Sequence, residues 1–204
     1  MDLEELLKRY RRGERDFIAI NLPDLVNVNL EGINLTRSSI GNCTYVNLKS
    51  ANLSQADLHF SRINQVNLDS AKLIQADIQQ SNWIEVSLKG AKLIQSDLSF
   101  SVFEICNFER ADLSQSNMKE GGFLRSNCKK VEINMSWFSM CGFQSVDFEG
   151  ATFNELYLSE NHFFNCNFKN ARGADLASFA GNTLQEVRLP NGEVVNKQIW
   201  ESFY

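Results

Sequence analysis

The chain lacks any apolar stretch that could cross a membrane, because no run approaches the ~18 residues that a transmembrane helix needs. Residues 1–14 are charged and contain no apolar core of the kind found in secretory signals, so we expect no export signal there. Basic residues are also in deficit, 20 against 25 acidic ones. The resulting net charge of −5 argues against direct binding of nucleic acid.

Patterns that carry catalysis or metal binding are equally scarce. The two histidines, His59 and His162, lie far apart in the sequence, and no glycine-rich phosphate loop occurs. None of the five cysteines belongs to a CxxC pair, so we predict no zinc site. An odd number of cysteines without an export signal favours the reducing cytoplasm. The sequence therefore predicts a cytoplasmic protein that is not an enzyme and has no catalytic residues, cofactor or metal.

A five-residue repeat runs without insertion from Val46 to Asn170. The central residue of every pentapeptide is apolar, and the residue two places before it is small except at Leu156 and Asn161. Neither a helix nor a single strand has this period. Two inward residues in every five predict a narrow tube, in which the large centre fills the axis and the small residue lies at a corner.

The length of one coil follows from a longer repeat. The segment that begins at Ala71 as AKLIQ-A-D returns 20 residues later, at Ala91, as AKLIQ-S-D. Before residue 46 the spacing between centres lengthens twice to eight residues. We expect three residues to bulge out each time, near Leu25 and near Cys43, so that Asn21 stacks with Asn47 and Cys43 is the one exposed thiol. The other four cysteines are expected to point inward.

Segments such as Ala51-Asn-Leu-Ser-Gln and Ala111-Asp-Leu-Ser-Gln resemble the A(D/N)LXX motif of the pentapeptide-repeat family. The resemblance implies an all-β fold, a right-handed quadrilateral parallel β-helix with four pentapeptides in each coil. Residues 6–17 and 189–193 are similar to the ends of many cyanobacterial members. From these patterns we expect a β-helix of about 7–8 coils over residues 15–170.

Both ends of this β-helix are expected to carry caps. Residues 1–14 predict a capping helix with Asp2 at its start, and residues 171–204 predict a C-terminal cap. Within that cap, Glu186 to Val195 is expected to form a hairpin and Asn196 to Phe203 a short helix. An alternative to simple capping is that the apolar C-terminus joins two tubes into a homodimer.

Three outward registers differ in character. Directly after each centre, one face carries charges that alternate in sign from coil to coil, and we expect this ladder to be structural: Lys49, Asp69, Lys89, Glu109, Lys129, Glu149 and Lys169. A second face carries the candidate acidic strip, Asp57, Asp77 and Asp97, which is either a solvated surface offset by Lys72 and Lys92 or an attractor of basic partners. A third, least polar face is the candidate protein-interaction surface, with Phe60, Ile84, Phe100, Val102, Ile105, Leu124 and Phe164.

The favoured function is a non-catalytic protein-interaction or regulatory scaffold with a protein partner of unknown identity. Family members implicated in quinolone resistance imply an alternative, a DNA-mimicking binder of a type II topoisomerase such as gyrase. The modest charge and the charge-balanced ladder of this chain depart from that pattern. An enzyme is the third class, and the lack of convergent reactive residues argues against it.

Overall fold

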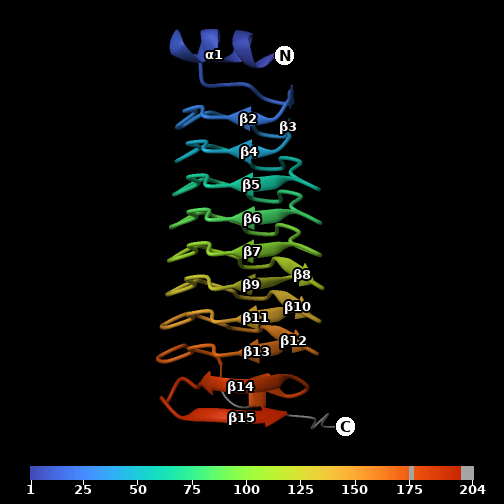
Figure 1. Ribbon diagram of the computed structural model, residues 1–204, viewed down its shortest axis with the longest axis vertical. Helices are drawn as coiled ribbons and strands as arrows, with labels where there is room; N and C mark the ends of the chain where they lie inside the picture. Colours follow the sequence, from blue (N-terminus) through green and yellow to red (C-terminus); the bar gives the residue numbers. More distant parts are fainter. Residues whose placement is uncertain (175–176, 199–204) are drawn as a thin grey trace.

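The computed structural model describes residues 1–174 and 177–198, and it is a right-handed quadrilateral β-helix of about 8 turns with one short helix at its N-terminus (Figure 1). Along the chain, the elements are α1 Leu3–Arg11, β1 Asn21–Leu22, β2 Leu25–Val26, β3 Ser39–Ile40, β4 Cys43–Thr44, β5 Arg62–Asn64, β6 Asn82–Ile84, β7 Val102–Glu104, β8 Asn117–Lys119, β9 Gly122–Leu124, β10 Trp137–Ser139, β11 Gly142–Gln144, β12 Tyr157–Ser159, β13 His162–Phe164, a 3-10 turn Ala177–Phe179, β14 Thr183–Arg188 and β15 Val194–Gln198. None of the helices among the described residues has the length and hydropathy of a membrane span.

The coils stack through parallel strand pairing. One face forms a sheet of ten strands from β2 to β15, and a second face contains the shorter sheets β1–β3 and β8–β10–β12. Among the described residues, the other two faces pair through isolated parallel bridges between residues 18 to 21 apart, such as Asn67 with Ser87. Figure 1 shows the strands of the long sheet superimposed along the tube. At a strand spacing of ~4.8 Å, about eight coils make a tube of ~38 Å.

The interior follows the predicted pattern. The repeat centres are buried, with the exception of the half-buried Leu158 near the C-terminal end. Phenylalanine centres stack from coil to coil along the axis, with ring centroids 5.8 Å apart for Phe123 and Phe143 and 4.7 Å apart for Phe143 and Phe163. Several hydroxyls at the small position are hydrogen-bonded, as Ser126 Oγ donates to the carbonyl of Phe103 at 3.1 Å, whereas the buried hydroxyls of Ser61 and Ser116 have no partner among the described residues. The small residue therefore ties one coil to the coil before it.

The backbone turns each corner at the residue that follows the centre by two places. These residues have φ near +55°, as in Gln75 (58°) and Gln95 (59°). The small residue next to them makes room, but it does not itself adopt the left-handed conformation. Stacked Gln side chains bridge one corner, where Gln75 Nε2 donates to Gln95 Oε1 at 3.0 Å.

The aspartate or asparagine that precedes many centres has a local role. At turns without a strand, the backbone N–H of the residue after the centre has no backbone acceptor, and the side chain two residues earlier supplies one. Asn47 Oδ1, for example, accepts from the Lys49 N–H at 3.1 Å. This contact explains the D/N position of the repeat, because a buried or crowded N–H without a partner destabilises a fold.

The expectation of two bulges is wrong. Leu25 and Cys43 are buried centres of β2 and β4; Leu25 pairs with Cys43, and Cys43 pairs with Ile63 in the next coil. Each eight-residue spacing therefore contains a shortened three-residue side, and the first coils have 18 residues. As a consequence Asn21 pairs with Ser39, whereas the partner of Asn47 is Asn29.

Helix α1 covers the N-terminal end of the tube. Asp2 caps it by accepting from the Glu5 N–H at 2.8 Å, and Leu6 is fully buried. The Tyr10 hydroxyl donates to the carbonyl of Glu31 at 2.8 Å, which fixes the helix to the first coils.

The C-terminal end closes differently. Strand β14 adds to β13 in parallel, and β15 then pairs with β14 in the antiparallel sense. The predicted hairpin is present with longer strands, but the predicted helix from Asn196 is wrong at its start, because β15 continues to Gln198. Residues 199–204, and with them the dimerisation prediction for Ile199, Trp200 and Phe203, lie outside the described residues.

Asn161, an exception to the small-residue rule, joins the cap to the tube. Its side chain is completely buried, accepts from the Cys141 N–H at 2.9 Å and donates to the Phe138 carbonyl at 2.9 Å. Its own N–H donates to Asn182 Oδ1 in the cap at 2.9 Å. A larger polar side chain therefore appears where the last full coil must hold the cap.

Candidate interaction surfaces

The long-sheet face, defined here as the outer surface of the ten-stranded sheet with its two corners, carries the apolar residues predicted to make contacts. Phe60, Phe100 and Ile105 lie at its corners with 62%, 45% and 45% of their surface exposed. Val102 and Phe164 are also exposed, whereas Ile84 and Leu124 are half-buried.

These residues form a mosaic and not one continuous patch. Glu104 pairs with both Ile84 and Leu124 in the sheet and so separates them, and its carboxylate forms an ion pair with Arg125. Gln144 separates Leu124 from Phe164 in the same way. This column is therefore not a contiguous apolar surface, and Phe60, Phe100 and Ile105 lie at the corners beside it.

The acidic strip is where the sequence predicts it, since Asp57, Asp77 and Asp97 pair in successive coils. Each is half-buried, and each accepts the backbone N–H of the residue two places on, as Asp77 does from Gln79 at 3.1 Å. Among the described residues, no ion pair joins Lys72 or Lys92 to the strip. The aspartates therefore cap the turns, but their like charges are offset only at Asp57.

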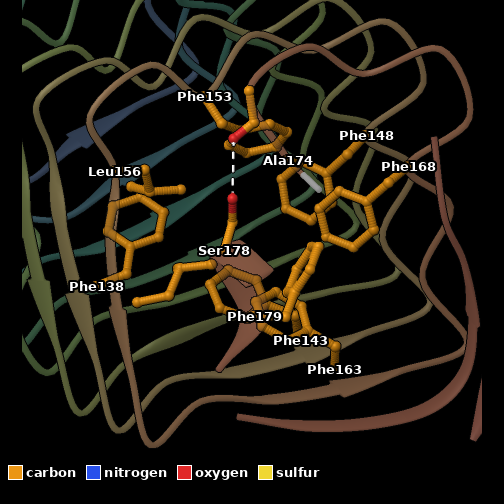
Figure 2. A pocket seen from close by; sticks show the side chains of 12 residues that line it. Phe138, Phe143, Phe148, Phe153, Leu156, Phe163, Phe168, Ala174, Ser178 and Phe179 are labelled. Atoms are coloured by element: carbon orange, nitrogen blue, oxygen red, sulfur yellow. Dashed lines mark hydrogen bonds between the residues drawn. The ribbon is translucent and has the colours of Figure 1, made fainter. Parts of the chain in front are cut away.

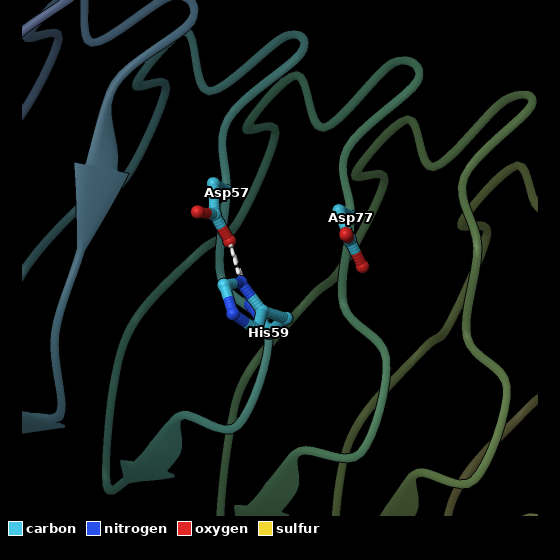
Figure 3. A group of neighbouring side chains, drawn as sticks. All are labelled: Asp57, His59 and Asp77. Atoms are coloured by element: carbon cyan, nitrogen blue, oxygen red, sulfur yellow. Dashed lines mark hydrogen bonds and ion pairs between the residues drawn. The ribbon is translucent and has the colours of Figure 1, made fainter.

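His59 provides that offset. Its Nδ1 contacts Asp57 Oδ1, and this hydrogen bond, with the nearby charge of Asp77, raises the pKa of His59 above its ordinary value (Figure 3). Ligand atoms of the three side chains all lie within 4.8 Å of one another, close enough for one cation. Because the cluster is open to solvent and its carboxylates already cap turns, we assign it no metal.

The tube has a second apolar surface, which was not predicted from the sequence. Trp137 and Tyr157 lie on β10 and β12 with 57% and 61% of their surface exposed, and their rings stack at 5.2 Å with 22° between the planes. Met135 and Met140 flank them at the two corners, also exposed. We call these four residues the aromatic patch. A comparison of residues 20 apart would have found it, because Trp137 and Tyr157 continue the column of Asp97 and Asn117.

The alternating charges form the expected register on one face, here called the ladder face. Lys129 Nζ lies 3.1 Å from Glu149 and 3.2 Å from Asp147. Neighbouring amides also stack, with Asn127 Nδ2 donating to Asn107 Oδ1 at 3.2 Å. These contacts all run between coils, which agrees with a structural role for this face.

Inside the described part of the tube, a small cavity lies close to the C-terminal cap. Its volume is about 20 Å³, and its wall consists mainly of phenylalanine rings, with Ser178 Oγ donating to the Gly173 carbonyl at 3.4 Å (Figure 2). A space of this size holds about one water molecule. A substrate or cofactor is larger than this cavity.

All five thiols are free and buried. The expectation that Cys43 is exposed is wrong, because its side chain fills the axis of the second coil with 1% of its surface accessible. Burial raises the pKa of Cys43, Cys106 and Cys166 to about 12 and that of Cys128 well above its ordinary value. Such thiols are packing residues and poor nucleophiles.

Comparison with known proteins identifies the repeat. A family model described as pentapeptide repeats, with 8 copies, matches residues 42–80 and 81–119. No curated protein is similar enough in sequence to count as a match. A trypsin-treated form of QnrB1, a plasmid-mediated fluoroquinolone resistance protein, is 16% identical, with a TM-score of 0.55 over 87% of this chain and 90% of that one. This similarity supports the fold alone.

Two cyanobacterial structures match over long stretches but superpose less well. HetL, a pentapeptide repeat protein involved in heterocyst differentiation regulation from Nostoc sp. strain PCC 7120, is 22% identical over 96% of this chain and 100% of that one, with a TM-score of 0.34. Rfr23 from Cyanothece 51142 is 23% identical over 57% of this chain and 97% of that one, with a TM-score of 0.37.

Proposed function

We propose that this chain, which matches the pentapeptide-repeat family model over residues 42–119, is a non-catalytic scaffold that binds another protein through the outside of its tube. The observation that carries this proposal is the set of large apolar side chains at exposed corners. Phe60, Phe100 and Ile105 hold left-handed backbone conformations there, with φ of 57°, 60° and 55°. That conformation is unfavourable for bulky and β-branched residues, and exposure of apolar surface adds a solubility cost.

Polar residues serve the same corners elsewhere in the tube, so the fold itself does not require the apolar ones. In the column of Phe60 and Phe100, the intervening and following coils have Gln80 and Glu120 with φ of 53° at both. A function that needs apolar contact gives a reason for the difference. We therefore assign the long-sheet face, with its corners, to partner binding.

A catalytic role has less support. The reactive side chains of the described residues lie on an open convex surface or inside the packed core, and His59 and His162 are on different faces. Catalysis needs several groups that converge on an enclosed reacting atom. The free thiols support a reducing compartment, and we propose the cytoplasm.

The alternative, a DNA-mimicking gyrase binder, also has less support. QnrB1 shares the fold, but its role does not follow from a similarity of 16% identity. A DNA mimic presents extended negative charge, whereas the ladder face of this chain alternates in sign from Lys49 to Lys169.

Site-specific photo-crosslinking in the host cell tests the proposal. The photoreactive residue p-benzoylphenylalanine would replace Ile105 or Phe164 on the long-sheet face, and Lys89 or Glu109 on the ladder face as matched controls. We expect a discrete crosslinked partner from the first pair and not from the second. Crosslinks that are equal from both faces, or that come only from the ladder face, would contradict the assignment.

A further inference from the structure

We propose that the acidic strip and the aromatic patch together form a docking site for a basic amphipathic α-helix of a partner protein, lying along the tube axis. This goes beyond the proposed function, because it assigns the neighbouring face, which shares the corner column of Phe60 and Phe100 with the long-sheet face, and gives the partner a defined chemistry. The face in question spans residues 55–60 and the corresponding segments of the next five coils, up to residues 155–160.

The aromatic patch supplies the apolar half of this site. Trp137 and Tyr157 replace the Asp and Asn that precede the centre in earlier coils, because at β8 this face changes from turns to strands and no longer needs a capping carboxylate. Nothing in strand pairing requires aromatic rings there, since Asn117 occupies the same register in β8. Exposed tryptophan and tyrosine side chains are the residues most often dominant in protein interfaces.

The charge on this face defines the partner. With six carboxylates and one lysine, this face has a net charge of −5, which equals the net charge of the whole chain. The acidic residues are Asp57, Asp77, Asp97, Glu120, Glu155 and Glu160, the basic residue is Lys119, and His59, counted here as neutral, is paired with Asp57. Such a face repels a second copy of itself, and it also repels nucleic acids and anionic membranes. A cationic segment is attracted to it.

The stacked rings can bind the same cations. A guanidinium placed over the exposed indole of Trp137 gains a cation–π interaction, and Glu155 and Glu160 lie at the two corners beside Tyr157 to pair with it. Arginine is therefore the preferred cation at the aromatic end. Lysine or arginine suits the acidic end, where the half-buried aspartates of the strip lie in one column.

The spacing of the coils matches a helix. Successive side chains in the column are ~4.8 Å apart, and one helical turn rises 5.4 Å. From Asp57 to Tyr157 the column spans five coil steps, ~24 Å, which corresponds to a helix of about 16 residues. In a β-strand lying along the axis, side chains on the same side would be ~6.6 Å apart. They would no longer match the ~4.8 Å spacing of the coils after two coils.

Peptide binding tests the proposal with the intact protein. The probe is a fluorescein-labelled helical peptide of about 16 residues, with leucine and arginine on one face of one half and lysine on the same face of the other half. A matched peptide replaces each lysine and arginine with glutamate. We expect the basic peptide to bind, by fluorescence anisotropy, at least tenfold more tightly than the acidic one. Its affinity should fall as salt is raised.

Variants then locate the site. Trp137→Ser with Tyr157→Ser should weaken binding at least tenfold. Asp77→Asn with Asp97→Asn, which keeps the capping acceptors, should weaken it severalfold and flatten the salt dependence. Glu109→Gln on the ladder face and Ile105→Asn on the long-sheet face should leave it within twofold. Circular dichroism verifies that each variant is folded.

Three outcomes would overturn the proposal. These are equal binding of the two peptides, unchanged affinity in the Trp137/Tyr157 variant, and a homodimer in sedimentation that this variant dissociates. The last outcome would assign the patch to a second copy. The crosslinking experiment on the long-sheet face is independent, so either proposal can fail while the other stands.

Discussion

Asp77 shows how one side chain can serve the fold and a surface at once. One of its oxygens accepts the Gln79 N–H, and its charge lies between those of Asp57 and Asp97. The acceptor is required by the turn, whereas the charge is not. Asparagine would supply the same acceptor without repulsion.

We therefore expect Asp77→Asn to leave the free energy of unfolding unchanged or to raise it by up to ~0.5 kcal/mol. Asp77→Ala removes the acceptor and should lower it by ~1 kcal/mol. Urea denaturation monitored by circular dichroism measures both. A larger loss for asparagine than for alanine would mean that the carboxylate has a role in folding beyond the turn.

The thiols provide a test of the interior at the same scale. Because Cys43 and the other four cysteines are buried with raised pKa values, a thiol reagent at pH 8 should label none of them in the native state and all five in denaturant. The unfolded thiols ionise near their ordinary pKa of 9.0, whereas Cys43 in the tube ionises near 12. Their contribution to stability is therefore complete below pH 9 and is lost as the pH rises towards 12. Fast labelling of Cys43 in the native state would instead support the exposed bulge that the sequence predicts.

At the scale of the element, the pentapeptide side could be predicted from sequence and its exceptions could not. Large and small residues alternate so regularly after Val46 that centres, corners and the 20-residue coil follow from spacing alone. The eight-residue spacing from Leu22 to Leu30 is ambiguous, because it equals either one side with three extra residues or two sides of three and five. Packing decides between them, since the apolar Leu25 gains burial as a centre.

Phe179, which closes the C-terminal end of the tube, is a second feature that could not be predicted from the sequence. Phe179 is fully buried and packs against Phe163 at 5.4 Å and Phe168 at 5.0 Å. It lies after the repeat has ended and has no register, so no periodicity marks it. Its ring forms part of the wall of the small cavity and closes the interior of the tube at this end.

Phe179→Ala should accordingly lower the free energy of unfolding by ~3 kcal/mol or more, because it enlarges an existing cavity at an end of the core. Phe164→Ala, one residue from the buried Phe163 but on the outer face, is the matched control and should cost less than ~1 kcal/mol. Thermal denaturation compares them. Similar losses for both would show that Phe179 does not close the tube.

Over the whole molecule, each coil contacts only its neighbours, so stability accumulates along one axis. The outer surface is not uniform along that axis. Two faces have charges of both signs, and one combines the acidic strip with the aromatic patch. The acidic strip could be predicted from the sequence because the repeat places it in register. The place of the aromatic patch follows from the same 20-residue spacing, but the stacking of its two exposed rings does not, because this face changes from turns to strands at β8.

Deletion of one whole coil tests this view of the molecule. Removal of residues 71–90 joins Ser70 to Ala91, and the sequence after the junction, AKLIQ, is the one that was removed. All faces stay in register, so we expect a folded tube shortened by ~4.8 Å. Removal of residues 71–75 deletes a quarter as many residues but shifts every later side by one face. Strands would then stack on turns, and the phenylalanine column would be broken. The shorter deletion should therefore have the lower midpoint of thermal unfolding, measured by circular dichroism. If it proves the more stable of the two, the faces are interchangeable and the register between coils does not determine the fold.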